Sequence, residues 1–113
     1  MHELRIAESL VEQVEAVRQA NGGGKVVSVD VRIGTWRQIV PEVLTSYFGH
    51  LSQNTALEGA RVDIDQVEAT GHCSECDEVF ALVDIFLVCP RCGSAVCTLA
   101  TGGELDLVGV ELE

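Results

Sequence analysis

The 113-residue chain is poor in aromatic side chains and has no long apolar segment. It has three Phe, one Trp and one Tyr for its core, although apolar residues make up 47% of the sequence. No apolar run reaches the roughly 20 residues that a membrane-spanning helix requires. The start of the chain also lacks the basic segment, apolar segment and cleavage site of a secretory signal. We therefore expect a cytoplasmic protein with no membrane partner.

Basic residues are also scarce, with seven Lys and Arg against 18 Asp and Glu, for a formal charge of −11 at pH 7. A surface of this sign repels a phosphate backbone, so we expect no nucleic-acid partner. Solubility alone can explain the acidity, and attraction of cations or basic proteins is the functional alternative. Gly22-Gly23-Gly24 is not followed by Lys-Ser or Lys-Thr, and no catalytic constellation is recognisable. We do not expect an enzyme.

The spacing of apolar residues predicts four elements before residue 69. Residues 3–19 are apolar at helical intervals and are followed by Asn21 and three glycines, which suit a helix end. Residues 25–33 alternate between apolar and polar, as a strand does. Pro41 suits the first turn of a second helix, and residues 61–68 predict a second strand that bulges or ends near Val67.

Composition changes near Ala69, where a cysteine-rich segment begins. Residues 104–113 then predict another strand, which we expect to return to the first sheet. The predicted fold is α+β, with a small sheet of about three strands packed by two helices and a zinc-ribbon module. The predicted domains are residues 1–69, completed by the C-terminal strand 101–113, and residues 70–100.

The strongest metal signal is a set of four cysteines arranged as two Cys-x-x-Cys pairs. Cys73 and Cys76 form the first pair, Cys89 and Cys92 form the second, and twelve residues separate them. Each pair can form a tight turn that presents two sulfurs, with Gly93 available where the backbone needs positive φ. In a reducing compartment such cysteines bind metal more often than they form disulfides. We expect a closed structural Zn(II) site with all four as ligands.

Other interpretations of the cysteine-rich segment stay open. A single iron suits the same four sulfurs. Redox disulfides need a more electropositive setting than this acidic segment offers. The fifth cysteine, Cys97, is most simply a small buried hydrophobic residue on a strand. His72 is most simply a neighbour of the cage, although it is the natural replacement ligand if the cage opens.

The N-terminal Met1-His2-Glu3 offers a second, open donor set. We expect the Met1 amine to be free, because the bulky His2 disfavours removal of the initiator. The amine, the intervening amide and the imidazole can form fused chelate rings around Ni(II) or Cu(II), which accept planar nitrogen ligands. Glu3 can add a backbone amide or a carboxylate oxygen. A solvated terminal histidine is the simpler alternative, and His50 is explained by its place near a helix end.

Together these features resemble the HypA/HybF family of hydrogenase maturation nickel metallochaperones over essentially the whole chain. The start motif is short, but it becomes specific when it is combined with the cysteine cage at this distance. Cys97 has no place in the usual family pattern. The resemblance rests on Met1-His2-Glu3, Ile33-Gly34, Val40-Pro41-Glu42, Glu58-Gly59-Ala60, the four cage cysteines and the segments Gly103-Glu104-Leu105 to Glu111-Leu112-Glu113.

The resemblance implies a nickel-binding α/β domain (residues 1–69 with 101–113) and a zinc-ribbon domain. It implies delivery of Ni(II) to the [NiFe] hydrogenase large subunit, with an accessory GTPase as a second partner. His2 would be the essential nickel ligand, with Met1 and Glu3 contributing backbone nitrogens and Glu3 tuning the site. Zn(II) would be structural. A weak homodimer is a further candidate assembly, and a zinc-ribbon adaptor between proteins, without nickel transfer, is the alternative function.

Overall fold

The computed structural model describes residues 2–82 and 87–113 and confirms the predicted α+β fold. The predicted helices and strands are present, and three further short strands build the cysteine-rich segment. In chain order the elements are α1 (His2–Ala20), β1 (Val26–Gly34), the 3-10 helix η1 (Thr35–Arg37), α2 (Pro41–Leu51), β2 (Arg61–Val67), β3 (Thr70–Cys73), β4 (Val79–Ala81), β5 (Cys97–Thr101) and β6 (Leu105–Leu112).

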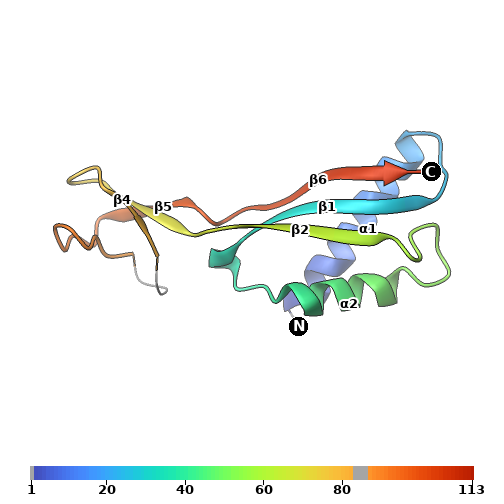
Figure 1. The fold of residues 1–113 in the computed structure, drawn as a ribbon, viewed down its shortest axis with the longest axis horizontal. Coiled ribbons are helices and arrows are strands. Elements are labelled where there is room, and N and C mark those ends of the chain that lie inside the picture. Colours follow the sequence, from blue (N-terminus) through green and yellow to red (C-terminus); the bar gives the residue numbers. More distant parts are fainter. Residues whose placement is uncertain (1, 83–86) are drawn as a thin grey trace. The chain divides into compact units, whose positions relative to one another are not determined.

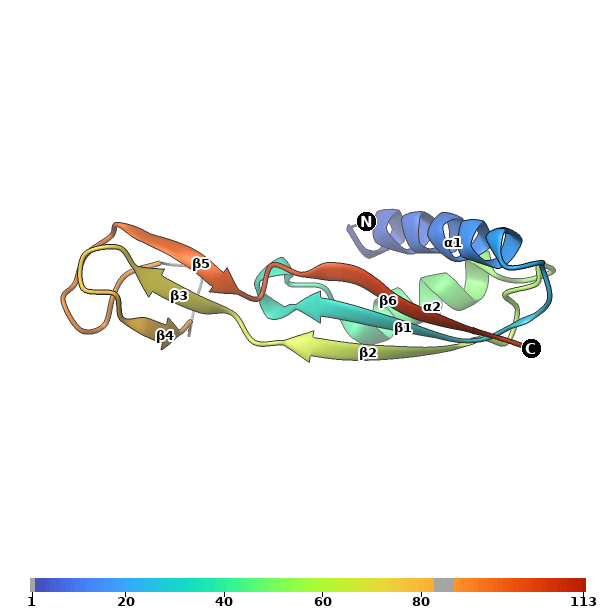
Figure 2. The same ribbon diagram turned by 90° about the horizontal axis from the view of Figure 1, so that it is seen from above.

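The first sheet has the strand order β2-β1-β6. β1 and β2 point in the same direction, and β6 runs opposite to them (Figure 2). The crossover through α2 allows β1 and β2 to lie parallel, because parallel neighbours cannot be joined by a tight turn. The expected return of the C-terminal strand is confirmed, since β6 lies beside β1.

α1 and α2 pack against each other and cover one face of this sheet (Figure 1). The alternating pattern predicted for β1 holds for its central residues, which face the helices. It fails at the start of the strand, where Val27 is exposed and Ser28 is buried. Ser28 Oγ is 3.3 Å from a carboxylate oxygen of Glu111, so its buried hydroxyl has a partner. The buried residues that form this core include Ala7, Leu10, Val14, Val29, Val31, Leu44, Phe48 and Leu57.

The second sheet has the order β4-β3-β5 and is antiparallel throughout. Residues 77–88 separate the two Cys-x-x-Cys pairs. β4 lies in this segment and pairs with β3, so the described hairpin is formed across the first cysteine turn. Residues 83–86 of the segment lie outside the described residues. Thr70 and Thr101 are joined by their hydroxyls at 2.7 Å, near the start of β3 and the end of β5.

Three separate chain segments meet beside the second sheet. Gly34 N–H donates to Glu104 O at 2.8 Å, and Trp36 N–H donates to Gly102 O at 3.0 Å. Thr35 Oγ1 accepts a hydrogen bond from the backbone N–H of Ala69 at 2.9 Å. A Cβ added to Gly34 would overlap the backbone carbonyl of Gly102. Glycine is therefore required at Gly34 by close backbone approach, because its own φ of −80° is ordinary.

The chain forms two compact units. The first consists of Met1–Arg32, Ile39–Asp65 and Asp106–Glu113, and the second consists of Ile33–Gln38 and Gln66–Leu105. Each unit contains one of the two predicted metal sites. Among the described residues, no helix has the length and apolar character needed to cross a membrane.

Candidate metal centres

The N-terminal donors lie at the start of α1, in the first unit. The helix begins at His2, one residue earlier than we predicted, and the His2 side chain is exposed. Met1, which we predicted to supply the free amine, lies outside the described residues. The first N–H groups of any helix lack an acceptor within the helix. Metal binding by backbone nitrogens at this position would therefore break no helical hydrogen bond.

Glu3 connects this end of α1 to the start of α2. Its Oε2 accepts a hydrogen bond from the Val40 N–H at 3.0 Å, and Val40 is the residue that caps α2. This bond, together with the backbone N–H of Glu3, lowers the pKa of the Glu3 carboxyl below its ordinary value. The carboxylate thus satisfies one of the free donors of the second helix. It also fixes the position of the first turn of α1, which carries His2.

The other two histidines occupy different settings. His50 is exposed in the last turn of α2, as expected for a helix-end histidine. His72 lies on β3, with Nε2 3.3 Å from a carboxylate oxygen of Asp77. Within the described part of the chain, neither residue belongs to a cluster of three or more metal-ligating side chains.

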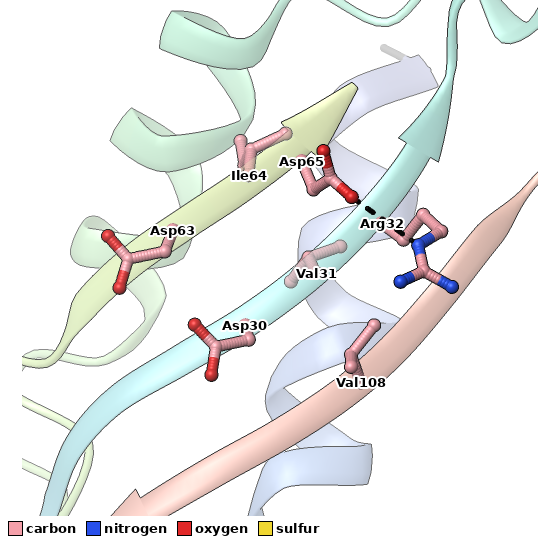
Figure 3. A pocket seen from close by; sticks show the side chains of 7 residues that line it. All are labelled: Asp30, Val31, Arg32, Asp63, Ile64, Asp65 and Val108. Atoms are coloured by element: carbon pink, nitrogen blue, oxygen red, sulfur yellow. Dashed lines mark ion pairs between the residues drawn. The ribbon is translucent and has the colours of Figure 1, made fainter. Parts of the chain in front are cut away.

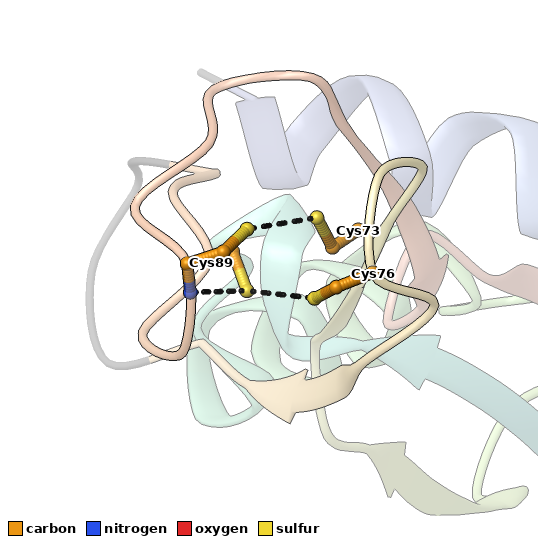
Figure 4. Close-up of side chains that lie close together, drawn as sticks. Cys73, Cys76 and Cys89 are labelled. Atoms are coloured by element: carbon orange, nitrogen blue, oxygen red, sulfur yellow. Dashed lines mark hydrogen bonds between the residues drawn. The ribbon is translucent and has the colours of Figure 1, made fainter.

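The four predicted cage cysteines come together in the second unit. Cys73 and Cys76 lie on one turn, and Figure 4 shows them facing Cys89 on the other. The two turns have the same backbone design. Asp77 N–H donates to Cys73 O, and Gly93 N–H donates to Cys89 O, each at 2.9 Å. Asp77 has φ of 60° and Gly93 has φ of 77°, so the positive φ expected at Gly93 is present.

The sulfur positions fit a single tetrahedral ion. Cys73 Sγ lies 3.6 Å from Cys92 Sγ, and Cys76 Sγ lies 3.6 Å from Cys89 Sγ. All four sulfurs are within 4.8 Å of one another. Four Zn–S bonds of about 2.3 Å in a tetrahedron give sulfur separations of about 3.8 Å. The cluster is therefore consistent with a zinc site.

Backbone donors favour the thiolate form that such an ion requires. A hydrogen bond from the Cys76 N–H lowers the pKa of Cys73. Burial opposes this effect, further hydrogen bonds add to it, and the resulting pKa is about 6. The N–H of Cys92 lies 3.5 Å from Cys89 Sγ and lowers the pKa of Cys89. Backbone hydrogen bonds thus stabilise the charged form of Cys73 and Cys89. Backbone hydrogen bonds also lower the pKa values of Cys76 and Cys92, but burial and the neighbouring sulfurs outweigh them, so both of these values are raised.

Cys97 stands outside the four-sulfur cluster but packs against it. It is half-buried on β5, with Sγ 3.4 Å from the carbonyl oxygen of Ser94. Burial, followed by the charge of Cys73, raises the pKa of the Cys97 thiol. Its predicted place on a strand is confirmed, but the predicted full burial is not, because Cys97 is only half-buried. Sequence periodicity did not indicate its position opposite Cys73, which depends on the β3–β5 register.

A groove on the face of the first sheet opposite the helices is lined by several carboxylates (Figure 3). Asp30, Asp63 and Asp65 line it together with Val108. Asp65 is paired with Arg32, with a carboxylate oxygen 3.5 Å from Nε. Within residues 2–82 and 87–113, the four cysteines are the one group of three or more His, Cys, Asp or Glu side chains placed closely enough to hold a metal ion. The groove is therefore a charged surface and not a metal centre.

This molecule thus has the features of a small metal-binding carrier, with a sulfur cage in one unit and an exposed N-terminal imidazole in the other. Residues 1–112 match the family model described as "Hydrogenase/urease nickel incorporation, metallochaperone, hypA". A hydrogenase maturation factor HypA from Roseiflexus sp. is 41% identical, covering 100% of this chain and 93% of the relative. A HypA from Methylocella silvestris is 36% identical over the full length of both chains.

Two solved structures agree with these matches. The solution structure of the Ni metallochaperone HypA from Helicobacter pylori has a TM-score of 0.70 at 25% identity, covering 99% of this chain and 97% of that one. A second HypA solution structure has a TM-score of 0.73 at 25% identity, with 100% and 97% coverage. The chain belongs to the HypA family of nickel metallochaperones. The predictions that it serves hydrogenase maturation and is a carrier, not an enzyme, are confirmed by this membership.

Proposed function

We propose that this protein binds Ni(II) at its N-terminus and passes it on for insertion into [NiFe] hydrogenase. His2 supplies the essential imidazole, and the Met1 amine and the backbone nitrogens of His2 and Glu3 complete the chelate. The observation that carries the proposal is the exposed imidazole on the first turn of α1, where backbone N–H groups have no helical acceptor. Ni(II) accepts such planar nitrogen sets.

The cargo site is open, which suits transfer. His2 is exposed, so a partner can approach the metal without unfolding the first unit. We propose the [NiFe] hydrogenase large subunit as the recipient and an accessory GTPase as the second partner, both in the cytoplasm. A formal charge of −11 favours basic contact surfaces on such partners.

We further propose that Cys73, Cys76, Cys89 and Cys92 hold one structural Zn(II). The closed set of four thiolates leaves no position for a substrate, so this metal stabilises the fold and is not transferred. The proposed domains are residues 1–69 with 101–113 for nickel and residues 70–100 for zinc. The presence of one predicted metal site in each compact unit supports a division of this kind.

The nickel proposal is tested by comparing the native N-terminus with an extension of a few residues before Met1. Extension converts the Met1 amine into an amide and removes the end of the fused chelate. We expect calorimetric titration with Ni(II) to show strong binding for the native protein and a large loss for the extended one. Because the chelate needs deprotonated nitrogens, affinity should also fall as pH is lowered. Equal binding by both proteins would favour a different nickel site, or the adaptor function if both bind weakly.

A further inference from the structure

Cys97 and the cage residue Cys73 face each other directly across the β3–β5 ladder. Ser74 N–H donates to Val96 O at 3.0 Å, on the far side of this pair. In an antiparallel ladder, that bond marks Cys73 and Cys97 as a non-hydrogen-bonded pair. Such pairs have Cα atoms about 4.5 Å apart, with their side chains close together. Disulfides form at Cα separations of about 4.4 to 6.8 Å, so this ladder position accepts one.

The surroundings of the pair connect it to an accessible thiol. Cys73 is fully buried, whereas Cys92 is exposed, and their sulfurs are 3.6 Å apart. Cys97 packs against the cluster that contains Cys73. A small oxidant can therefore reach the cage at Cys92, and the oxidation can pass inward to Cys73 and then to Cys97.

We propose that Cys97 is an oxidation site of this protein, at which a peroxide converts the Cys73–Cys97 pair into a cross-strand disulfide. The disulfide withdraws Cys73 from the sulfur cage. The expected weakening of zinc binding rests on the proposed structural Zn(II), whereas formation of the disulfide does not.

The chemistry requires one peroxide molecule. The Cys92 thiolate attacks it, an S–O bond forms as the O–O bond breaks, and hydroxide leaves. The Cys73 thiolate then attacks the sulfur of the Cys92 sulfenic acid, so that an S–S bond forms and a second hydroxide leaves. Cys97, giving its proton to hydroxide, attacks Cys73 Sγ and expels the Cys92 thiolate. In total, the Cys73 thiolate and the Cys97 thiol lose two electrons, and the peroxide is reduced to one water and one hydroxide.

The β3–β5 ladder favours the Cys73–Cys97 disulfide over the Cys73–Cys92 disulfide that forms first. Cys73 and Cys97 are the cysteines of β3 and β5, and the antiparallel pairing of these strands places them opposite each other. Cys92 lies on a separate turn. Burial of Cys89 against Cys73 and Phe80 joins this turn to the first, and exposed side-chain contacts also link the two turns. These contacts are Ser94 Oγ to a Glu75 carboxylate oxygen at 3.1 Å and Arg91 to Glu78 at 3.9 Å. These exposed contacts contribute little, and Cys92 is itself exposed. When oxidation displaces the metal, Cys92 therefore moves away from Cys73 before the ladder separates.

The test uses the full-length protein as purified, with its zinc content measured first. Equimolar hydrogen peroxide is added, free thiols are alkylated, and linked peptides are sequenced by tandem mass spectrometry without reduction. We expect loss of two hydrogens per chain, linkage of Cys73 to Cys97 as the main product, and full reversal by dithiothreitol. Cys97→Ser should keep its zinc before oxidation, lack this linkage, and recover less of its free thiol after reduction.

A main product that links Cys73 to Cys92 or to Cys76 would overturn the inference, as would an unchanged recovery of thiols in Cys97→Ser. Absence of zinc from the purified protein would instead contradict the proposed structural site. Without zinc, the mass spectrum of the linked peptides would still show whether Cys73 is joined to Cys97. Failure of the zinc proposal and failure of the disulfide proposal are therefore distinguishable.

Discussion

At the scale of single residues, Glu3 has a role that its place in the N-terminal motif does not reveal. The sequence predicts that it contributes a backbone amide or a carboxylate oxygen to nickel. In the structure, its Oε2 is already bonded to the Val40 N–H at the start of α2. This contact favours a positioning role for the side chain, which holds the first turn of α1 and leaves the backbone nitrogens to the metal.

The Glu3 contact predicts different stabilities for two substitutions. Glu3→Ala removes the acceptor and should lower the thermal unfolding midpoint, whereas Glu3→Gln keeps an acceptor oxygen and should lower it less. Because folding lowers the Glu3 pKa, its charged form stabilises the protein above its ordinary pKa of 4.5. That stabilisation is lost as pH falls through the lowered value, and both variants should lack it. Melting curves between neutral and acid pH that coincide for all three proteins would contradict this role.

Gly34 and Gly49 form a matched pair of glycines with opposite expected behaviour. A Cβ at Gly34 would meet the Gly102 carbonyl, whereas a Cβ at Gly49, exposed within α2, meets nothing within 4 Å. Gly34→Ala should destabilise the protein by at least about 2 kcal/mol, because backbone atoms must move. Gly49→Ala should stabilise it by up to about 1 kcal/mol. Urea unfolding of both variants checks the prediction, which fails if Gly34→Ala has wild-type stability.

At the scale of elements, the second sheet is too small to be stable without help. β3, β4 and β5 are strands of three to five residues. The cluster of buried residues beside them consists of Cys73, Phe80 and Cys89. Apolar burial of this extent cannot offset the entropy of ordering the segment. A structural zinc contributes on the order of 10 kcal/mol in small zinc peptides, which is enough to decide whether such a sheet folds.

Substitution of a cage cysteine should therefore unfold the second sheet. Cys89→Ser should lose the one zinc expected per chain and lose amide protection in β3, β4 and β5, because a hydroxyl is a poor replacement for a thiolate. Cys97→Ser is the matched control and should keep both the zinc and the amide protection of these strands. Metal analysis and amide hydrogen exchange measured on the same samples test the ligand set. A Cys97→Ser protein without zinc would show that the assigned ligands are wrong.

The two helices and the three strands of the first sheet were predictable from the sequence, because each is specified by a local pattern. The alternation of Val29, Val31 and Ile33 and the helical spacing of Leu10 and Val14 are visible in a single short window. The cage was predictable for a similar reason, since each turn is formed by one Cys-x-x-Cys pair and the following residues.

Contacts between distant segments were not predictable in this way. Neither the approach of Gly34 to Gly102 nor the pairing of Cys73 with Cys97 leaves a local signal, because each depends on how strands from different parts of the chain align. The bond from Val40 to Glu3 is of the same kind. Periodicity specifies the face of a strand, whereas register is set by the packing and turns of the whole sheet.

At the scale of the whole molecule, the two proposed metal sites lie in different compact units. The second unit holds four thiolates in a closed set, which suits a metal that stays. The first unit presents an exposed imidazole at a helix start, which suits a metal that is handed on. The central claim is that nickel is held at His2 and that this site does not depend on the zinc cage.

The most direct measurement is a Ni(II) calorimetric titration of three proteins with native N-termini: wild type, His2→Ala and His50→Ala. His50 is a matched control, because it is also an exposed histidine at a helix end of the first unit. We predict that His2→Ala loses tight nickel binding while keeping the wild-type circular dichroism spectrum and zinc content. His50→Ala should bind nickel as the wild type does. Wild-type nickel affinity in His2→Ala would contradict the account.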